Sequence, residues 1–207
     1  MIGIVDYNAG NITSVARSLK SLGIEFVLSK NPSDLENCEK LIFPGVGDAA
    51  YAMEQLKITG FDNFLKNWAA DGKPLLGICL GSQIIFDFSE EGDALCLGLI
   101  PGKIRHMENL FSENYKLKIP HMGWNNLSFK NGGSYILENV CEKSDFYFVH
   151  SYVICPEDKS VIKAVADYGI EIPAVVQKGS VVSCQFHPEK SGEAGLKILK
   201  NFCLSNV

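Results

Sequence analysis

The sequence predicts an α/β fold: a mostly parallel, doubly wound sheet with helices on both faces and an added antiparallel section. In the first half of the 207 residues, short apolar runs typical of buried strands alternate with segments whose apolar residues recur at helical spacing. From about residue 95 to residue 180 the pattern changes to short strand-like pieces separated by turn residues, which favours antiparallel strands. No linker, repeat or low-complexity tract interrupts the chain, so we expect a single domain over residues 1–207.

The elements of the first half are expected in alternation. Ile2–Val5 is an apolar run that predicts a buried strand, and Asn11 stands where a helix cap is favoured, before a helix that Gly23 ends. Pro44 and Gly45 stop a later strand. The remaining predicted elements of this half are strands at 25–28, 41–43 and 74–78, and helices at 49–56, 61–70 and 81–88.

The second half is expected to add mainly strands. Turn residues separate its apolar pieces, and one further buried strand and a closing helix follow near the end of the sequence. The predicted strands lie at 98–104, 147–152, 161–166, 174–177 and 181–185, and the predicted helix lies at 192–204.

Composition and charge argue against several classes of function. The net charge of −5 and the pI near 5.4 argue against nucleic acid as the main partner, because phosphate binding needs a concentrated basic surface. The sequence has no run of 18 apolar residues and no start of the kind found in signal peptides, so we expect a cytoplasmic protein. Its seven cysteines are odd in number and none is spaced as C-x-x-C, so we expect no metal, cofactor or disulfide framework.

Cys79 is the candidate nucleophile. It lies in Gly77-Ile78-Cys79-Leu80-Gly81, where a predicted strand turns sharply into a predicted helix, the geometry of a nucleophile elbow. The flanking glycines permit the tight turn, and the start of a helix favours the thiolate that attacks. The backbone N–H of Leu80 would point at a developing oxyanion. A buried structural cysteine beside packing glycines is the alternative explanation.

A thiolate mechanism also needs a base, and His187 stands out among the four histidines. It follows a predicted buried strand in the run from Gln185 to Glu189, and Pro188 favours an extended backbone at His187. In an extended chain, residues two apart point the same way, so Glu189 can orient the His187 imidazole. An ordinary surface turn with a charged tip is the alternative explanation.

Three further segments carry weaker signals. The glycines of residues 44–47 can present a backbone N–H to a tetrahedral intermediate, although a plain turn explains them equally well. Residues 120–125 predict a turn; Trp124 in the core and His121 satisfied locally are favoured over catalysis there, and a partner contact is a third alternative. Residues 147–152 predict a buried strand.

Taken together, these segments resemble class I glutamine amidotransferases, and among them the glutaminase subunits of imidazole glycerol phosphate synthase. The resemblance spans nearly the whole sequence. Its class-level motifs are residues 77–83 and 185–189, and its more specific motifs are Asp6-Tyr7 with Gly10-Asn11, and residues 44–47, 120–125 and 147–152.

The resemblance implies roles for individual residues. It implies a triad of Cys79 as nucleophile, His187 as general base and then acid, and Glu189 as the residue that orients His187. Gly47 and Leu80 would supply the oxyanion hole. By the same resemblance, glutamine would be bound by Gly47, Gln83, Ser151 and Tyr152, and the partner interface would contain Asn11, Met122, Trp124 and Lys190.

The resemblance also implies an acceptor for the ammonia. Ammonia released into water is largely protonated and diluted, so the acceptor site should be close and shielded, and a single glutaminase domain leaves no room for it. The implied partner is a TIM-barrel cyclase. The resulting heterodimer would make imidazole glycerol phosphate and aminoimidazole carboxamide ribonucleotide in histidine biosynthesis.

Three alternatives stay open at this point. A paralogous subunit could donate ammonia for amidation of a surface sugar, with the same chemistry at Cys79. A cysteine peptidase-like hydrolase on a similar fold is the second alternative, and Gln83 argues against it. A binding module with a decayed site is the third, and the intact set of Cys79, His187 and Glu189 argues against it.

Overall fold

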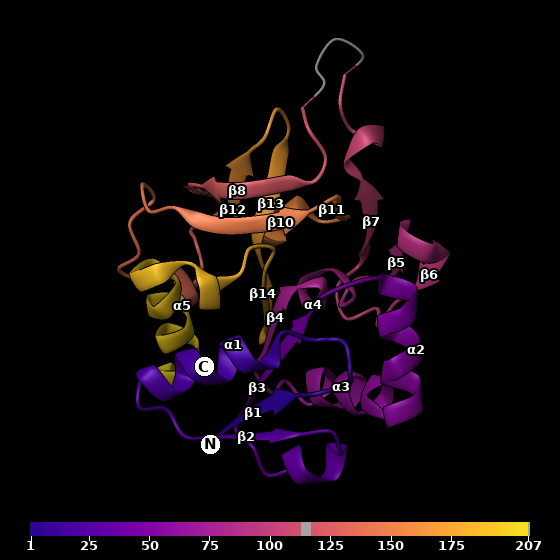
Figure 1. The fold of residues 1–207 in the computed structure, drawn as a ribbon, viewed down its shortest axis with the longest axis vertical. Helices are drawn as coiled ribbons and strands as arrows, with labels where there is room; N and C mark the ends of the chain where they lie inside the picture. Colours follow the sequence, from indigo (N-terminus) through magenta and orange to yellow (C-terminus); the bar gives the residue numbers. More distant parts are fainter. Residues whose placement is uncertain (113–116, 207) are drawn as a thin grey trace.

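A computed structural model describes residues 1–112 and 117–206 (Figure 1). The largest sheet in these residues has eight strands, in the order β2-β1-β3-β4-β14-β13-β12-β9. The first five are parallel and the rest pair antiparallel, which confirms the predicted sheet with its added antiparallel section. The strands are β1 (Ile2–Val5), β2 (Phe26–Ser29), β3 (Lys40–Gly45), β4 (Leu75–Cys79), β14 (Val181–Cys184), β13 (Glu171–Lys178), β12 (Ile162–Asp167) and β9 (Ser128–Phe129).

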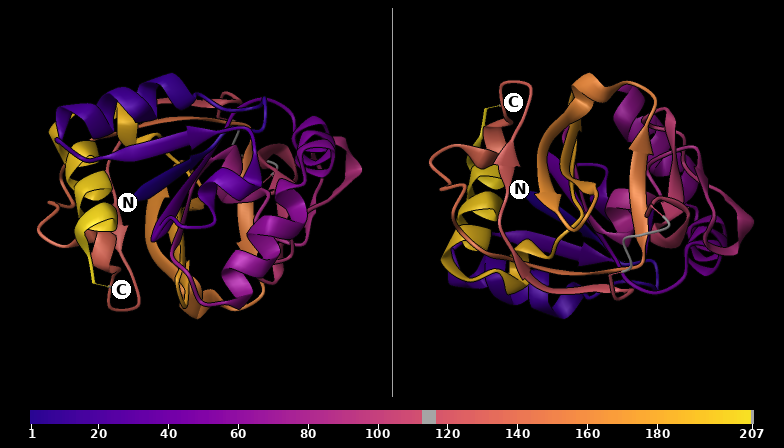
Figure 2. Two further views of the ribbon diagram at one scale, coloured as in Figure 1. Left: turned by 90° about the horizontal axis from the view of Figure 1, so that it is seen from below. Right: turned by 90° about the horizontal axis from the view of Figure 1, so that it is seen from above.

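Helices cover both faces of this sheet (Figure 2). Neighbouring residues of a strand point to opposite faces, so β4 supplies Leu76 and Ile78 to one apolar core and Leu75 to the other. The first core is covered by α1 (Ile12–Ser21) and α5 (Gly192–Leu204), and the second by α2 (Ala49–Thr59) and α3 (Phe61–Ala70). None of the helices in the described residues is long and apolar enough to cross a membrane.

Two smaller sheets lie beyond the carboxyl ends of the parallel strands, in the upper half of Figure 1. One pairs β8 (His121–Asn125) with β10 (Phe146–His150). The other contains β11 (Tyr152–Pro156), β7 (Gly102–His106), β5 (Phe88–Ser89) and β6 (Ala94–Leu95). Short 3-10 turns connect the elements: η1 (Pro32–Leu35), η2 (Glu91–Asp93), η3 (Met107–Asn109), η4 (Tyr135–Leu137), η5 (Lys159–Val161) and η6 (Pro188–Lys190).

The helix predicted at 81–88 is wrong beyond its first turn. The observed helix α4 covers only Leu80–Gln83. The carbonyl of Ile84 accepts a hydrogen bond from the Leu97 N–H at 2.9 Å, whereas a longer helix would need this carbonyl for the N–H four residues on. A one-turn helix also aligns few peptide dipoles, so its N-terminus contributes little to favouring a thiolate at Cys79.

The strand predicted at 147–152 is two strands. β10 ends at His150 and β11 begins at Tyr152, and the two belong to different sheets. The carbonyl of Ser151, between them, accepts a hydrogen bond from the Met107 N–H at 2.9 Å. The chain therefore passes from one small sheet to the other at Ser151.

Two more predictions are corrected. Residues 120–125 were expected to form a turn, but five of them form β8 and pair with β10. The strand predicted at 98–104 begins only at Gly102. Gly98 has a φ of +69° and donates its N–H to the Phe86 carbonyl at 2.7 Å, so the chain there follows a turn and cannot join a ladder.

Candidate active site

Cys79 lies where β4 ends and α4 begins, at the carboxyl end of the central parallel strands. Its φ of +54° and ψ of −110° lie in a region that residues other than glycine rarely adopt. The turn is therefore the strained turn of a nucleophile elbow, and the strain falls on the cysteine itself.

The glycines around Cys79 serve close packing more than turn geometry. A Cβ added to Gly77 would lie 2.7 Å from the Gly81 carbonyl oxygen, and one added to Gly45 would lie 2.6 Å from both the Gly81 nitrogen and the Tyr7 hydroxyl. Neither Gly77 nor Gly81 has a positive φ. The backbone of the elbow can approach β3 and β4 this closely because these positions lack side chains.

His187 forms a buried pair with Glu189. His187 Nδ1 lies 2.7 Å from Glu189 Oε1, and the two side chains are 2% and 1% exposed. Because β14 is the parallel neighbour of β4, the segment after β14 brings His187 to the sheet edge where Cys79 lies. Burial lowers the pKa of His187, but hydrogen bonds and charge from Cys79 and Glu189 outweigh burial and raise the pKa to about 9. His187 therefore keeps its second proton at neutral pH.

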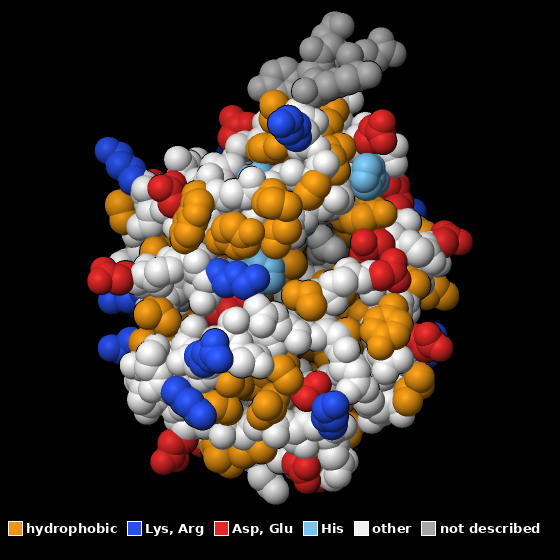
Figure 3. All heavy atoms as spheres, in the orientation of Figure 1, with side chains coloured by type: hydrophobic (Ala, Val, Ile, Leu, Met, Phe, Trp, Pro, Cys, Tyr) orange, Lys and Arg blue, Asp and Glu red, His pale blue; other side chains and the backbone are white. Residues whose placement is uncertain are grey.

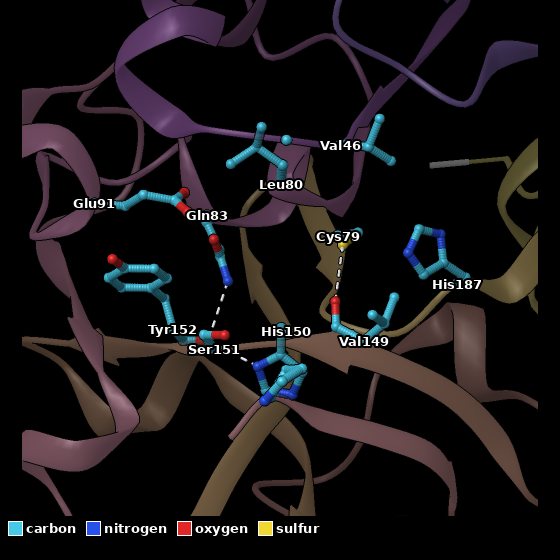
Figure 4. Close-up of a pocket in the computed structure, with 12 residues that line it drawn as sticks. Val46, Cys79, Leu80, Gln83, Glu91, Val149, His150, Ser151, Tyr152 and His187 are labelled. Atoms are coloured by element: carbon cyan, nitrogen blue, oxygen red, sulfur yellow. Dashed lines mark hydrogen bonds between the residues drawn. The ribbon is translucent and has the colours of Figure 1, made fainter. Parts of the chain in front are cut away.

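A cavity of about 310 Å³ opens in front of Cys79 (Figure 4). Cys79 and His187 lie at one end of it, and Gln83, Tyr152 and Glu91 lie at the other. Thus the structure gathers the triad candidates and all the residues implied for glutamine binding at one site, with Glu189 behind His187. The cavity is lined by Val46, Gly47, Cys79, Leu80, Gln83, Glu91, Pro120, Val149, His150, Ser151, Tyr152 and His187.

The side-chain amide of Gln83 has a defined orientation. Its Nε2 donates to the Tyr152 carbonyl at 3.1 Å and to Gln185 Oε1 at 2.9 Å. With both amide hydrogens bonded to the protein, Oε1 is the atom of Gln83 that can accept a hydrogen bond from a ligand. Gln185 belongs to the motif around His187, but its contact with Gln83 joins residues 102 positions apart and has no signal in the sequence.

The two oxyanion candidates lie at the cavity. Gly47 is exposed and has a φ of +96°, and Leu80 is the first residue of α4. Val46, between β3 and Gly47, donates its N–H to the Ala9 carbonyl at 3.0 Å. The Val46 N–H is therefore occupied in this conformation, which leaves the N–H groups of Leu80 and Gly47 as the candidate oxyanion donors at the cavity.

Glu91 is a cavity residue that the sequence did not single out. Its carboxylate accepts a hydrogen bond from the Ala49 N–H at 3.0 Å. Burial raises the pKa of Glu91 above its usual range, against the lowering effect of that N–H. The sequence offers no reason to select Glu91, because the acidic run from Glu90 to Asp93 resembles an ordinary exposed turn. Its position in the cavity lining is what marks it.

The outer face of the β8–β10 pair carries exposed apolar side chains (Figure 3). Met122 and Trp124 are 61% and 59% exposed, so the expectation that Trp124 lies in the core is wrong. Trp124 packs edge-on against Tyr147, with ring centroids 5.9 Å apart, and Lys190 Nζ lies 5.7 Å from the centre of the Tyr147 ring. Along β8, strand alternation turns Met122 and Trp124 outward. It turns His121 inward, where this residue is 3% exposed.

Asn11 lies at the start of α1, but it does not cap the helix through a backbone N–H. Its side-chain oxygen accepts a hydrogen bond from the Ser14 hydroxyl at 3.1 Å, and the residue is half-buried. α1 packs against η6, which carries Lys190, and the Ser18 hydroxyl donates to the Glu189 carbonyl at 3.4 Å. Asn11 therefore belongs to the helix that packs beside the Lys190 turn.

Residues 3–206 match the family described as glutamine amidotransferase class-I. The chain belongs to this family. It is 47% identical over 203 residues to the imidazole glycerol phosphate synthase subunit HisH of Geobacillus sp. (strain WCH70), covering 98% of this chain and 95% of that one. It is 43% identical, with the same coverage, to the subunit of that name from Bacillus subtilis (strain 168). The chain is thus a glutamine amidotransferase grouped with the HisH subunits.

Solved structures of lower sequence identity share the fold. A crystal structure of a glutamine amidotransferase has a TM-score of 0.74 at 20% identity, covering 97% of this chain and 98% of the other. PurLQS from Thermotoga maritima has a TM-score of 0.70 at 20% identity, covering 97% and 96%. At this level of identity the likeness establishes the fold alone. Within residues 1–112 and 117–206, no group of three or more His, Cys, Asp or Glu side chains is arranged to hold a metal ion.

Proposed function

We propose that this chain is the glutaminase subunit of an imidazole glycerol phosphate synthase, hydrolysing L-glutamine and passing the ammonia to a cyclase partner. The observation that carries the proposal is the buried pair of His187 and Glu189, 2.7 Å apart, at the same cavity as the strained Cys79. Relatives that carry the HisH name at more than 40% identity support the choice of enzyme within the class.

The chemistry begins at Cys79. His187, whose pKa is raised to about 9 by Cys79 and Glu189, holds a proton beside Cys79, and the thiolate is the form of Cys79 that attacks. The sulfur attacks the side-chain amide carbon of glutamine, and His187 gives its proton to the departing amine, which leaves as ammonia. Water then attacks the thioester with neutral His187 as the base, and glutamate and the starting pair are regenerated. Glu189 holds the imidazole in position throughout.

Glutamine binding follows from the other end of the cavity. Gln83 Oε1 accepts a hydrogen bond from the amino group of the substrate, and the Glu91 carboxylate balances the charge of that group. Ser151 and Tyr152 bind from the junction of β10 and β11. With the amino acid end held there, the side-chain amide reaches toward Cys79 at the opposite end.

The oxyanion of the tetrahedral intermediate would be stabilised by backbone N–H groups of Leu80 and Gly47. One such donor typically contributes about 3 kcal/mol to the transition state. The N–H of Val46 is already bonded to Ala9, so the 44–47 segment offers Gly47 first.

The acceptor of the ammonia is a TIM-barrel cyclase that docks on the surface containing Asn11, Met122, Trp124 and Lys190. The exposed apolar side chains Met122 and Trp124 support this, because aromatic and Met side chains are enriched in protein interfaces. The heterodimer combines ammonia with phosphoribulosyl aminoimidazole carboxamide ribonucleotide, in the cytoplasm, and makes imidazole glycerol phosphate and aminoimidazole carboxamide ribonucleotide.

A glutaminase assay with and without the cyclase and its nucleotide substrate tests this function. We expect weak turnover by the chain alone and a sharp rise in the complete mixture. Complementation of a histidine auxotroph separates the proposal from the sugar-amidation alternative, because an ammonia donor for surface sugars would not restore growth.

A further inference from the structure

A buried hydrogen-bond network runs from the cavity to β8. His150 Nδ1 lies 2.7 Å from the Tyr152 carbonyl oxygen, and His150 Nε2 lies 3.1 Å from His121 Nδ1. The same Tyr152 carbonyl accepts from Gln83 Nε2, which also donates to Gln185. These five residues therefore form one connected network, and the Tyr152 carbonyl is its junction.

Only one placement of the protons on the two imidazole rings is consistent with these contacts. A carbonyl oxygen only accepts, so the proton of neutral His150 lies on Nδ1, and its Nε2 accepts from the Nδ1–H of His121. His121 Nε2 is then an acceptor, and the amide nitrogen of Asn125 lies 3.4 Å from it. A second proton on either ring would place two N–H groups face to face.

Packing fixes the rings as well. His121 and His150 are 3% and 6% exposed, and burial lowers their pKa values to about 4 and about 3. His121 is stacked between Phe148 and Tyr168, with ring centroids 4.7 Å and 4.1 Å away. Neither ring can turn without breaking a stack or a buried hydrogen bond, so His121 is a rigid donor to His150, and His150 is a rigid donor to the Tyr152 carbonyl.

We propose that His150, held by His121, is a positioning residue that fixes the Tyr152 carbonyl and thereby the end of the Gln83 amide that faces the substrate. The inference rests on the proposed glutamine pocket. Turning the Gln83 amide over exchanges its oxygen for an NH₂ group, which cannot accept from the substrate amine. A carbonyl held at Tyr152 keeps Nε2 on the protein side and Oε1 on the substrate side.

Three substitutions at one position test the proposal. His150→Asn keeps an amide nitrogen near the place of Nδ1, so it can still donate to the Tyr152 carbonyl. His150→Gln extends to the place of Nε2 and loses that donor, and His150→Leu loses both contacts. Glutamate release by the chain mixed with the cyclase and its nucleotide substrate, over a range of glutamine concentrations, gives KM and kcat separately.

The expected result is a rise in KM for glutamine in His150→Gln and His150→Leu of about three- to tenfold, the effect of one lost hydrogen bond, with kcat within about twofold of wild type. His150→Asn should restore a KM close to the wild-type value. Tyr168→Phe is the matched control: it keeps the ring stacked on His121, loses only the hydroxyl bond to Lys118, and should leave KM unchanged.

Equal KM values in the three variants would overturn the inference, as would a loss of kcat with KM unchanged. If His150→Leu does not fold, the KM values of His150→Asn and His150→Gln are sufficient to test the inference, because both variants carry a polar side chain. The proposed function fails in a different way, by the absence of glutamate release from wild-type chain mixed with the cyclase and its nucleotide.

Discussion

Glu189 contacts His187 through one of its two carboxylate oxygens. Its Oε1 lies 2.7 Å from His187 Nδ1, while its buried Oε2 has no hydrogen-bond partner in the described part of the chain. No second donor therefore competes with the imidazole for this carboxylate. The pair holds the ring orientation and helps to raise the pKa of His187 to about 9 against the effect of burial.

Replacing Glu189 by Gln is expected to lower the pKa of His187 from about 9, because the anion that favours the imidazolium is removed. In the proposed mechanism protonated His187 is the acid for ammonia departure, so the alkaline decline of kcat should move to lower pH, and kcat should fall by about 10²-fold or more. The measurement is a kcat profile from mildly acidic to alkaline pH. Glu193→Gln, at an exposed position in the first turn of α5, is the control and should keep the wild-type profile.

Cys79→Ala is expected to abolish glutamine-dependent synthesis by the complex and to leave synthesis from added ammonia intact. The reason is that, in the proposed mechanism, the sulfur acts only in ammonia release. Product formation from each nitrogen source measures the two activities. Cys141→Ala, which changes an exposed cysteine, should preserve both. Loss of the ammonia-dependent activity in Cys79→Ala would contradict the division of labour between the subunits.

Strain at Cys79 predicts an unusual order of stability. With a φ of +54°, the position suits glycine better than alanine. Cys79→Gly should therefore be more stable than Cys79→Ala by about 1 kcal/mol, measured as the free energy of unfolding in urea. At Cys203, in the last turn of α5 and without a positive φ, the order should reverse, because glycine is a weaker helix former than alanine. The same order at both positions would remove the case for strain at the elbow.

Trp124→Ala should weaken cyclase binding and leave the melting temperature of the chain nearly unchanged. The side chain is 59% exposed, so its removal creates no core cavity, yet aromatic side chains of this kind dominate many interfaces. We expect about a 30-fold rise in Kd, measured by titration with the cyclase. Leu95→Ala, which truncates a 76% exposed residue of β6, should bind as wild type does.

Local patterns predicted much of this molecule. Apolar runs identified the parallel strands because both faces of such a sheet are buried. The contact of His187 with Glu189 was expected from a separation of two residues in an extended chain. The backbone is extended at His187, but Glu189 lies in the 3-10 turn η6, so the contact forms across this turn. Cys79 was identified as the candidate nucleophile from its neighbours in sequence, because the glycines on either side of it mark the elbow.

What the sequence did not predict depends on partners distant along the chain. The helix predicted at 81–88 ends early because the Leu97 N–H donates a hydrogen bond to the Ile84 carbonyl. Trp124 looked like a core residue, since its hydrophobicity does not tell which face of a strand is covered. The contact between His121 and His150 arises from strand pairing over 29 residues, which no periodicity marks.

Cys79 and His187 both contact the main chain of β10. The Tyr147 carbonyl accepts the His187 backbone N–H at 2.9 Å, and the Val149 carbonyl lies 4.0 Å from Cys79 Sγ. These contacts do not depend on which side chains the strand carries. Evolution or design can therefore change the outward residues of this strand and of β8 to suit a different partner, while the backbone contacts to Cys79 and His187 remain.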